Sequence, residues 1–200
     1  MKINKTIIKI ISILSLAVIL LLWPILILSN NSEIWFLLQK DNTVLSKGEI
    51  KMYDQSIISF FNGDENNLDF LKFEEISHLQ NVRSLLIKTD LTFWLSLNSF
   101  SLSILYIRKS AKNILRVIPI LVISFLSLLL MLSILSFNSL FLRFHETFFT
   151  ENYSFPSYSM LKILFPDSFF KDIFIFYFIL SVLGCLIGMI VSYRLKVKKL

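Results

Sequence analysis

Two histidines, His78 and His145, are the side chains of this sequence that are best suited to chemistry at neutral pH. They are the only histidines in the chain. Each lies in a short polar stretch beside an apolar block, FEEISHLQNVR (73–83) and SLFLRFHETFFTEN (139–152). An imidazole titrates close to neutral pH, so it can accept and return a proton during a reaction. The pair is therefore our candidate for proton transfer.

The rest of the sequence offers no activated nucleophile. Enzymes that form an acyl intermediate use a serine, a cysteine or a similar group beside a base. No Gly-x-Ser-x-Gly sequence occurs, and the single cysteine, Cys185, lies within an apolar block, where we expect it to pack. A lone cysteine also excludes an intramolecular disulfide. Two histidines without a nucleophile suit direct attack by the substrate's own amine, hydroxyl or a water.

Two other interpretations stay open. Glu75 and His78 are spaced i, i+3, and His145 with Glu146 would complete a two-histidine, carboxylate metal site of a membrane hydrolase. This spacing is common on amphipathic helices, so we predict no metal and no other cofactor. In the other interpretation the chain is a non-enzymatic membrane assembly protein that binds another envelope protein, and both histidines are incidental.

The elements that must position the histidines are four long apolar blocks without a charged side chain. Hydrophobic residues make up 55% of the 200, and the mean hydropathy is +0.70. A helix needs about 20 residues to cross a hydrocarbon layer about 30 Å thick. We therefore predict four transmembrane helices. The blocks are Ile10–Leu28, Leu91–Tyr106 (slightly short), Val117–Phe137 and Ile173–Tyr193. We expect the first to be retained, because LILSNNSEIW offers no clear cleavage pattern of a signal peptide.

The distribution of charge predicts the orientation of these helices. Residues 1–9, 107–116 and 194–200 hold 11 of the 20 Lys and Arg residues and none of the 14 Asp and Glu residues. By the positive-inside rule these segments are cytoplasmic, so both termini are inside and both histidines are outside. The net charge of +6 then anchors the chain to membrane lipids. No basic stripe with interleaved aromatic residues occurs elsewhere, so we predict no nucleic-acid partner.

The predicted fold is an all-α integral membrane protein with a small mixed α/β extracytoplasmic cap. The stretch 29–90 is too long for a simple connector and is predicted to form the cap. In it WFLLQKDNTVLSKG and LDFLKF have strand-like patterns, whereas EIKMYDQSIISFF and FEEISHLQNVRSLLI have the period of amphipathic helices. The segments are the tail and first helix (1–28), the cap (29–90), two helices with a basic turn (91–137), a second outer loop (138–172), and the last helix with a basic tail (173–200).

The apolar blocks also restrict the kind of membrane function. They hold no Asp, Glu, Lys, Arg or His, so a proton or ion pathway would have no titratable step. This argues against a pump or a coupled transporter. Gly184 and Gly188 form a small-xxx-small pair that lets another helix approach closely.

The sequence leaves the height of His78 open. It lies ten residues before Lys88, so a straight helix at 1.5 Å per residue would hold it about 15 Å above the membrane entry. Either a bend near Lys88–Asp90 lowers it, or the cap encloses a pocket at that height.

Three motifs give the chain a family resemblance. They are the His-Leu-x-x-Val stretch at His78, the Phe-His-x-x-Phe-Phe stretch at 144–149 and the Leu-Phe-Pro-x-x-Phe-Phe stretch at 164–170, set between four predicted helices in this order, with the loop around Tyr53 as weaker support. In this, the sequence resembles the bacterial lipoprotein intramolecular transacylase family over nearly its whole length.

The resemblance implies a multi-pass plasma-membrane acyltransferase with an outward-facing cap. Such an enzyme moves the sn-2 acyl chain of a diacylglyceryl-cysteine lipoprotein onto that cysteine's α-amino group, which leaves a lyso-form lipoprotein. The family's two catalytic histidines correspond to His78 and His145. As a hypothesis, His145 deprotonates the amine and His78 stabilises the oxyanion or returns the proton, or the two roles are exchanged. Candidates for substrate binding are Arg83 and Arg143, near the histidines in sequence, together with Tyr53 and Asn152.

Overall fold

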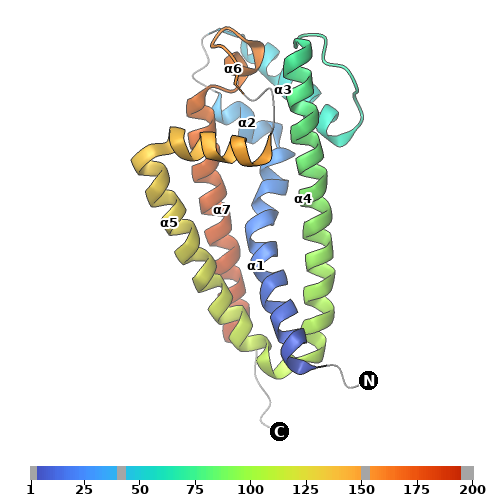
Figure 1. The fold of residues 1–200 in the computed structure, drawn as a ribbon, viewed down its shortest axis with the longest axis vertical. Helices are drawn as coiled ribbons and strands as arrows, with labels where there is room; N and C mark the ends of the chain where they lie inside the picture. The colour runs from blue at the N-terminus through green and yellow to red at the C-terminus, as the bar shows by residue number, and fades with distance from the viewer. Residues whose placement is uncertain (1–3, 40–43, 150–153, 195–200) are drawn as a thin grey trace. The chain divides into compact units, whose positions relative to one another are not determined.

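The computed structural model describes residues 4–39, 44–149 and 154–194, apart from the side chain of Lys109, and every element in these ranges is helical. Figure 1 shows the seven helices labelled in chain order. They are α1 (Lys5–Ser29), α2 (Ser32–Leu38), α3 (Lys47–Asn62), α4 (Phe73–Tyr106), α5 (Arg108–Phe148), α6 (Met160–Leu164) and α7 (Asp167–Arg194).

The chain divides into two compact units, each with its own core. Unit 1 comprises Met1–Ile25, Thr89–Met131 and Tyr177–Leu200, and unit 2 comprises Leu26–Lys88 and Leu132–Phe176. The long helices α1, α4, α5 and α7 contribute residues to both units. Both histidines belong to unit 2.

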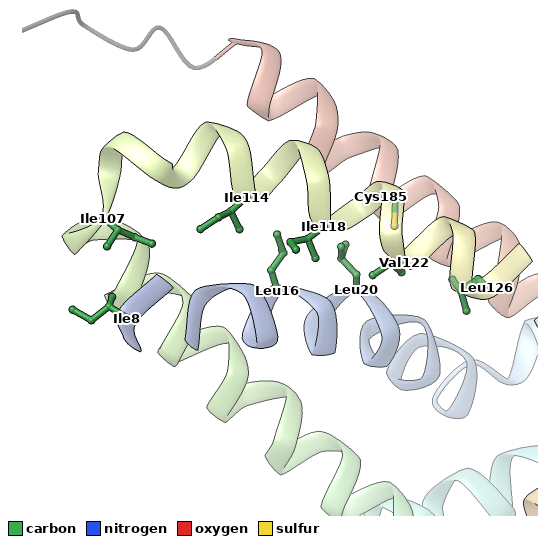
Figure 2. Packing of buried hydrophobic residues seen from close by; sticks show 9 residues of the cluster. All are labelled: Ile8, Leu16, Leu20, Ile107, Ile114, Ile118, Val122, Leu126 and Cys185. Carbon is green, nitrogen blue, oxygen red and sulfur yellow. The ribbon is translucent and has the colours of Figure 1, made fainter. Parts of the chain in front are cut away.

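Unit 1 is a helical bundle whose core is aliphatic. Side chains of α1 and α5 meet there (Figure 2), and Cys185 on α7 is fully buried among them, which confirms its expected role in packing. Several buried serines of this unit are paired: the hydroxyls of Ser12 and Ser103 lie 2.6 Å apart, and Ser192 Oγ donates to the Lys112 carbonyl at 2.9 Å. Such pairing is required where no water can compensate a buried polar group.

Among the described residues, three helices are long and apolar enough to cross a membrane, namely Lys5–Ser29, Ser110–Phe148 and Asp167–Arg194. They include three of the four predicted apolar blocks. The fourth block, Leu91–Tyr106, lies within α4 but is not one of the three spans, since Asn98 and several serines dilute its apolar character. Its role as a crossing helix therefore stays a prediction.

The sequence predicted close helix approach at the two glycines of α7, and the structure shows it at Gly184. A Cβ at Gly184 would lie 2.6 Å from Nε1 of Trp23 on α1, closer than packed atoms can stand. A Cβ at Gly188 would lie 3.5 Å from Pro119 on α5, which is an ordinary contact. Only Gly184 is therefore required to lack a side chain.

The strands predicted for the cap are wrong in the described residues. Ser32–Leu38, which contains the apolar run WFLL, is helical because Asn31 caps its first turn by accepting from the Ile34 N–H. The LDFLKF stretch is a turn in which the Leu71 N–H donates to the Leu68 carbonyl and both side chains are buried. A short apolar run fits either structure, and here local capping and turn bonds decide.

The core of unit 2 gathers apolar side chains from five helices and from the loop before α4. Trp35 lies in it, with its Nε1–H donating to the Leu28 carbonyl at 2.6 Å. A capping box between Ser46 and Glu49 starts α3, and Gly63, with φ at +92°, ends it. The buried members of the cluster are Trp35, Ile57, Phe60, Leu68, Leu71, Leu79, Leu161, Leu164 and Phe169.

Unit 2 also contains a buried carboxyl group. Asp54 is fully buried, and its Oδ1 accepts a hydrogen bond from Gln39 Nε2 at 3.1 Å. The same nitrogen donates to the Leu164 carbonyl at 2.9 Å, which fixes the orientation of the amide. Within the ranges that the structure describes, Asp54 Oδ2 and Gln39 Oε1 have no hydrogen-bond partner. Burial raises the pKa of Asp54 to about 7, so a proton on the carboxyl gives this pair the donor that it lacks.

We predict that Gly184→Ala destabilises the protein and that Gly188→Ala does not. The new methyl group at 184 must displace the Trp23 ring, and such overpacking costs about 1–3 kcal/mol. Thermal unfolding of both variants in the same detergent measures the difference. Equal unfolding temperatures for the two variants would contradict the close approach at Gly184.

We also predict that Asp54→Asn removes a pH dependence of stability. The folded carboxyl has a pKa of about 7 against about 3.9 in an unfolded chain. The free energy of unfolding should therefore fall as pH rises from about 4 to about 7, and level off above that range. Asparagine keeps the acceptor and supplies an N–H in place of the O–H, so the variant should lack this fall.

The measurement is thermal unfolding between about pH 4.5 and 8.5, with the exposed Asp64→Asn as the matched control. The wild type and the control should lose stability relative to Asp54→Asn across this range. If the stability of all three proteins changed with pH in parallel, Asp54 would be ionised in the folded protein.

Candidate active site

The structure brings His78 of α4 and His145 of α5 together in unit 2. Their ring centroids are 6.2 Å apart and the ring planes differ by 15°, so the imidazoles are stacked. Both side chains are buried, with 9% of His78 and 8% of His145 exposed. Residues 67 positions apart in the sequence thus form one pair, as the sequence analysis expected.

Phenylalanine rings surround the pair. Phe149 touches both imidazoles, with its centroid 5.0 Å from that of His78 and 5.4 Å from that of His145. Phe155 packs against His78 at 5.5 Å, and Phe141 packs against His145 at 4.1 Å. These apolar neighbours exclude water and disfavour a charged imidazole. Burial, with a further contribution from His145, lowers the pKa of His78 to about 4.

The hydrogen bonds of the two rings differ. His145 Nδ1 lies 2.8 Å from the Phe141 carbonyl, one helical turn earlier. Because a carbonyl only accepts, Nδ1 carries a proton, and the acceptor lone pair of a neutral His145 is on Nε2. Within the described part of the chain, His78 Nδ1 is buried without a hydrogen-bond partner. His145 is thus fixed in a defined tautomer, whereas His78 has a buried ring nitrogen whose hydrogen-bonding capacity is unused there.

A break in α5 determines the direction of the segment that carries His145. Ser136 has extended backbone, with φ at −160° and ψ at 78°, so α5 consists of two helical segments joined at a kink. Its Oγ donates to Ser139 Oγ at 2.8 Å. By contrast, α4 runs as one helix from Phe73 to Tyr106. The bend that the sequence allowed near Lys88–Asp90 is therefore absent, and a bend in α5 takes its place.

Glu75 has a structural position that the sequence analysis missed. It is 2% exposed and lies one turn before His78 on α4. Its Oε2 accepts from the Lys72 N–H at 2.8 Å, and its Oε1 accepts from the Leu161 N–H at 2.9 Å. The carboxylate thereby joins the start of α4 to α6. Both of its oxygens are used by backbone donors, which counts against Glu75 as a metal ligand.

The other predicted site residues lie in different surroundings. The Arg83 guanidinium lies over the Phe60 ring at 5.4 Å, and its Nη2 stands 2.7 Å from where a Cβ of Gly63 would be, so it packs on the end of α3. Arg143 is exposed. It lies two residues before His145 on α5, so the two side chains are separated by about 200° around the helix axis. The half-buried Tyr53 packs on Phe70 at 4.3 Å. Asn152 lies outside the described residues.

We predict that His78 stays neutral down to about pH 5, because its pKa is lowered from 6.5 to about 4. The unfolded chain regains the ordinary pKa, so unit 2 should lose stability as pH falls from about 6.5 through 4. An NMR titration of the two imidazoles, assigned with His78→Gln, measures the pKa directly. A His78 signal that titrates near 6.5 would show that the ring is hydrated.

Comparison with known proteins identifies the family. The model of the lipoprotein intramolecular transacylase family, Lit, matches residues 3–170. The solved structure of the membrane-integral lipoprotein intramolecular transacylase Lit from Bacillus cereus matches with a TM-score of 0.84 at 18% identity, over 95% of this chain and 94% of that chain.

Two variants of the same Bacillus protein also match. The variant with a histidine replaced by arginine has a TM-score of 0.80 at 16% identity, over 94% of this chain and 90% of that chain. The variant with a histidine replaced by alanine has a TM-score of 0.81 at 16% identity, over 96% of this chain and 93% of that chain. No curated protein sequence matches. The structures share the fold, and the family model covers most of the chain. The chain therefore belongs to the lipoprotein intramolecular transacylase family.

Proposed function

We propose that this protein moves the sn-2 acyl chain of a diacylglyceryl-cysteine lipoprotein onto the α-amino group of the same cysteine. Membership of the transacylase family gives the class of reaction, an intramolecular acyl transfer. The observation that carries the proposal is the stacked and buried pair of His78 and His145. Ester and amine belong to one substrate molecule, so the enzyme has to align them and move a proton.

His145 is the proton carrier in this mechanism. The amine nitrogen attacks the ester carbonyl carbon, and His145 Nε2 takes the proton that the nitrogen loses. The C–O bond at the sn-2 position then breaks, and the same proton returns to the leaving oxygen, so that an ester and an amine become an amide and an alcohol. The hydrogen bond of Nδ1 to the Phe141 carbonyl supports this role because it keeps the Nε2 lone pair in place.

His78 donates a hydrogen bond to the oxyanion that forms at the carbonyl. Its lowered pKa keeps it neutral, so it acts as an N–H donor without changing its own charge. The phenylalanines around the pair also favour an uncharged substrate amine, the form that can attack, because an ammonium group is poorly solvated there. We retain Arg143 as the candidate for a lipid headgroup, with Arg83, Tyr53 and Asn152 as further substrate-binding candidates.

We further propose a multi-pass plasma-membrane protein with four crossings and both termini in the cytoplasm. The apolar half of α4 supports the fourth crossing, because Leu91, Leu95 and Leu102 are largely exposed. At one end of unit 1, Ile8 and Ile107 share a cluster, and Ser192 bonds to Lys112. Exposed basic side chains gather near this end, which supports its cytoplasmic location by the positive-inside rule. They are Lys5, Lys9, Arg108, Lys112, Arg116 and Arg194.

We predict that the protein adds an acyl chain to lipoprotein amino termini and that either histidine substitution abolishes the transfer. The protein is expressed in a bacterial strain that lacks its own N-terminal acylation, and lipoprotein N-terminal peptides are analysed by mass spectrometry. His78→Gln and His145→Gln should each reduce the rate by roughly 10²–10⁴-fold, the usual contribution of a proton-transfer group.

The control is Glu146→Gln, an exposed neighbour of His145, which should retain the activity. All variants are compared at equal amounts of folded protein in the membrane. N-terminal peptides that stay unmodified with folded wild type would refute the function. Full activity of both histidine variants would refute the mechanism alone.

A further inference from the structure

A pocket adjoins the histidine pair in unit 2. Its volume is about 260 Å³, and it lies between the start of α4 and the segment that leads into α6. Six of the residues that line it matter here, namely Lys72, Glu74, Glu75, Phe155, Tyr158 and Ser159. The mechanism proposed above uses none of them.

Phe155 separates this pocket from the imidazoles. Its side chain lines the pocket and also packs on His78 with a centroid distance of 5.5 Å. Glu75, on the pocket wall, lies one helical turn before His78. Because an extended chain spans about 3.3–3.6 Å per residue, about two residues connect a group held at His78 to this pocket.

The pocket is built rather than incidental. The Glu75 carboxylate joins the two walls through the backbone N–H groups of Lys72 and Leu161. Ser159 caps α6 by accepting from the Lys162 N–H at 3.3 Å, so this wall has a fixed backbone as well. Across the opening, the Lys72 ammonium lies over the Tyr158 ring, 5.8 Å from its centroid.

The composition of the walls indicates which part of a substrate fits. An acyl chain requires an apolar lining, whereas this pocket combines charged, hydroxyl and aromatic side chains. Its volume is below the roughly 300–1,000 Å³ of pockets that enclose whole drug-sized ligands. A short peptide suits it better, because an ammonium group such as that of Lys72 can bind a backbone carbonyl, and an aromatic ring such as that of Tyr158 can cover a side chain.

We propose that this pocket binds the first residues of the lipoprotein that follow its acylated cysteine. The inference rests on the proposed function and adds a peptide subsite to it. The reacting lipid head lies at the histidines, and the peptide passes Phe155 into the pocket. Binding energy gained there aligns the substrate without contact with the reacting atoms.

The test compares two synthetic diacylglyceryl lipopeptides with purified wild-type protein in detergent. One carries five residues after the cysteine, and the other ends in an amide directly after it. Lys72→Ala and Tyr158→Ala should raise KM for the long substrate by about three- to tenfold with little change in kcat, because they remove ground-state contacts. For the short substrate the variants and the wild type should have equal KM.

Lys47→Ala and Tyr193→Ala are the matched controls, since both side chains are exposed and lie outside the pocket. Neither should change KM for either substrate.

An equal rise in KM for both lipopeptides in the Lys72 and Tyr158 variants would show that the pocket holds lipid instead of peptide. An unchanged KM for both lipopeptides would show that the pocket takes no part in substrate binding. If the wild type converts neither lipopeptide while histidine-dependent transfer to lipoproteins persists in cells, the subsite fails as stated and the function stands. Absence of transfer in cells as well would refute the function itself.

Discussion

The burial of two imidazoles against each other among phenylalanine rings is the constraint on which the rest of unit 2 depends. Neutral imidazoles can be packed 6.2 Å apart, whereas two charged ones would repel in a site with little water. Unit 2 must therefore hold Phe141, Phe149 and Phe155 against the rings. Phe141 belongs to the last part of α5, Phe149 directly follows that helix, and Phe155 lies in the segment before α6, so the pair depends on both segments being fixed.

Buried carboxylates fix these segments in two different ways. Glu75 accepts from two backbone N–H groups and joins α4 to the segment that carries Phe155. Asp54 accepts from a single side-chain donor and leaves one oxygen without a partner. Glu75 thereby holds the start of α4 against α6 through backbone donors on both sides. Burial raises the pKa of Asp54 to about 7, so this carboxyl couples the core of unit 2 to pH.

Much of this arrangement was predictable from the sequence, and the misses have physical causes. Uncharged blocks about as long as a bilayer requires predicted the apolar parts of α1, α5 and α7, and the small-xxx-small pair at Gly184 predicted a close approach. The strands failed because a four-residue apolar run has no period of its own, so Asn31 as a cap decided for a helix.

The bend at Ser136 and the role of Glu75 left no sequence signal. Neither proline nor glycine marks the bend, although Pro119 lies within the same helix. The distant partner of Glu75, the Leu161 N–H, lies 86 residues away in the sequence, and backbone donors are the same at every position. Side-chain types predicted the candidates for the chemistry, and long-range backbone bonds help to determine where those residues stand. An enzyme whose two reacting groups arrive on one molecule needs the second kind of information most, because its catalysis consists chiefly of alignment.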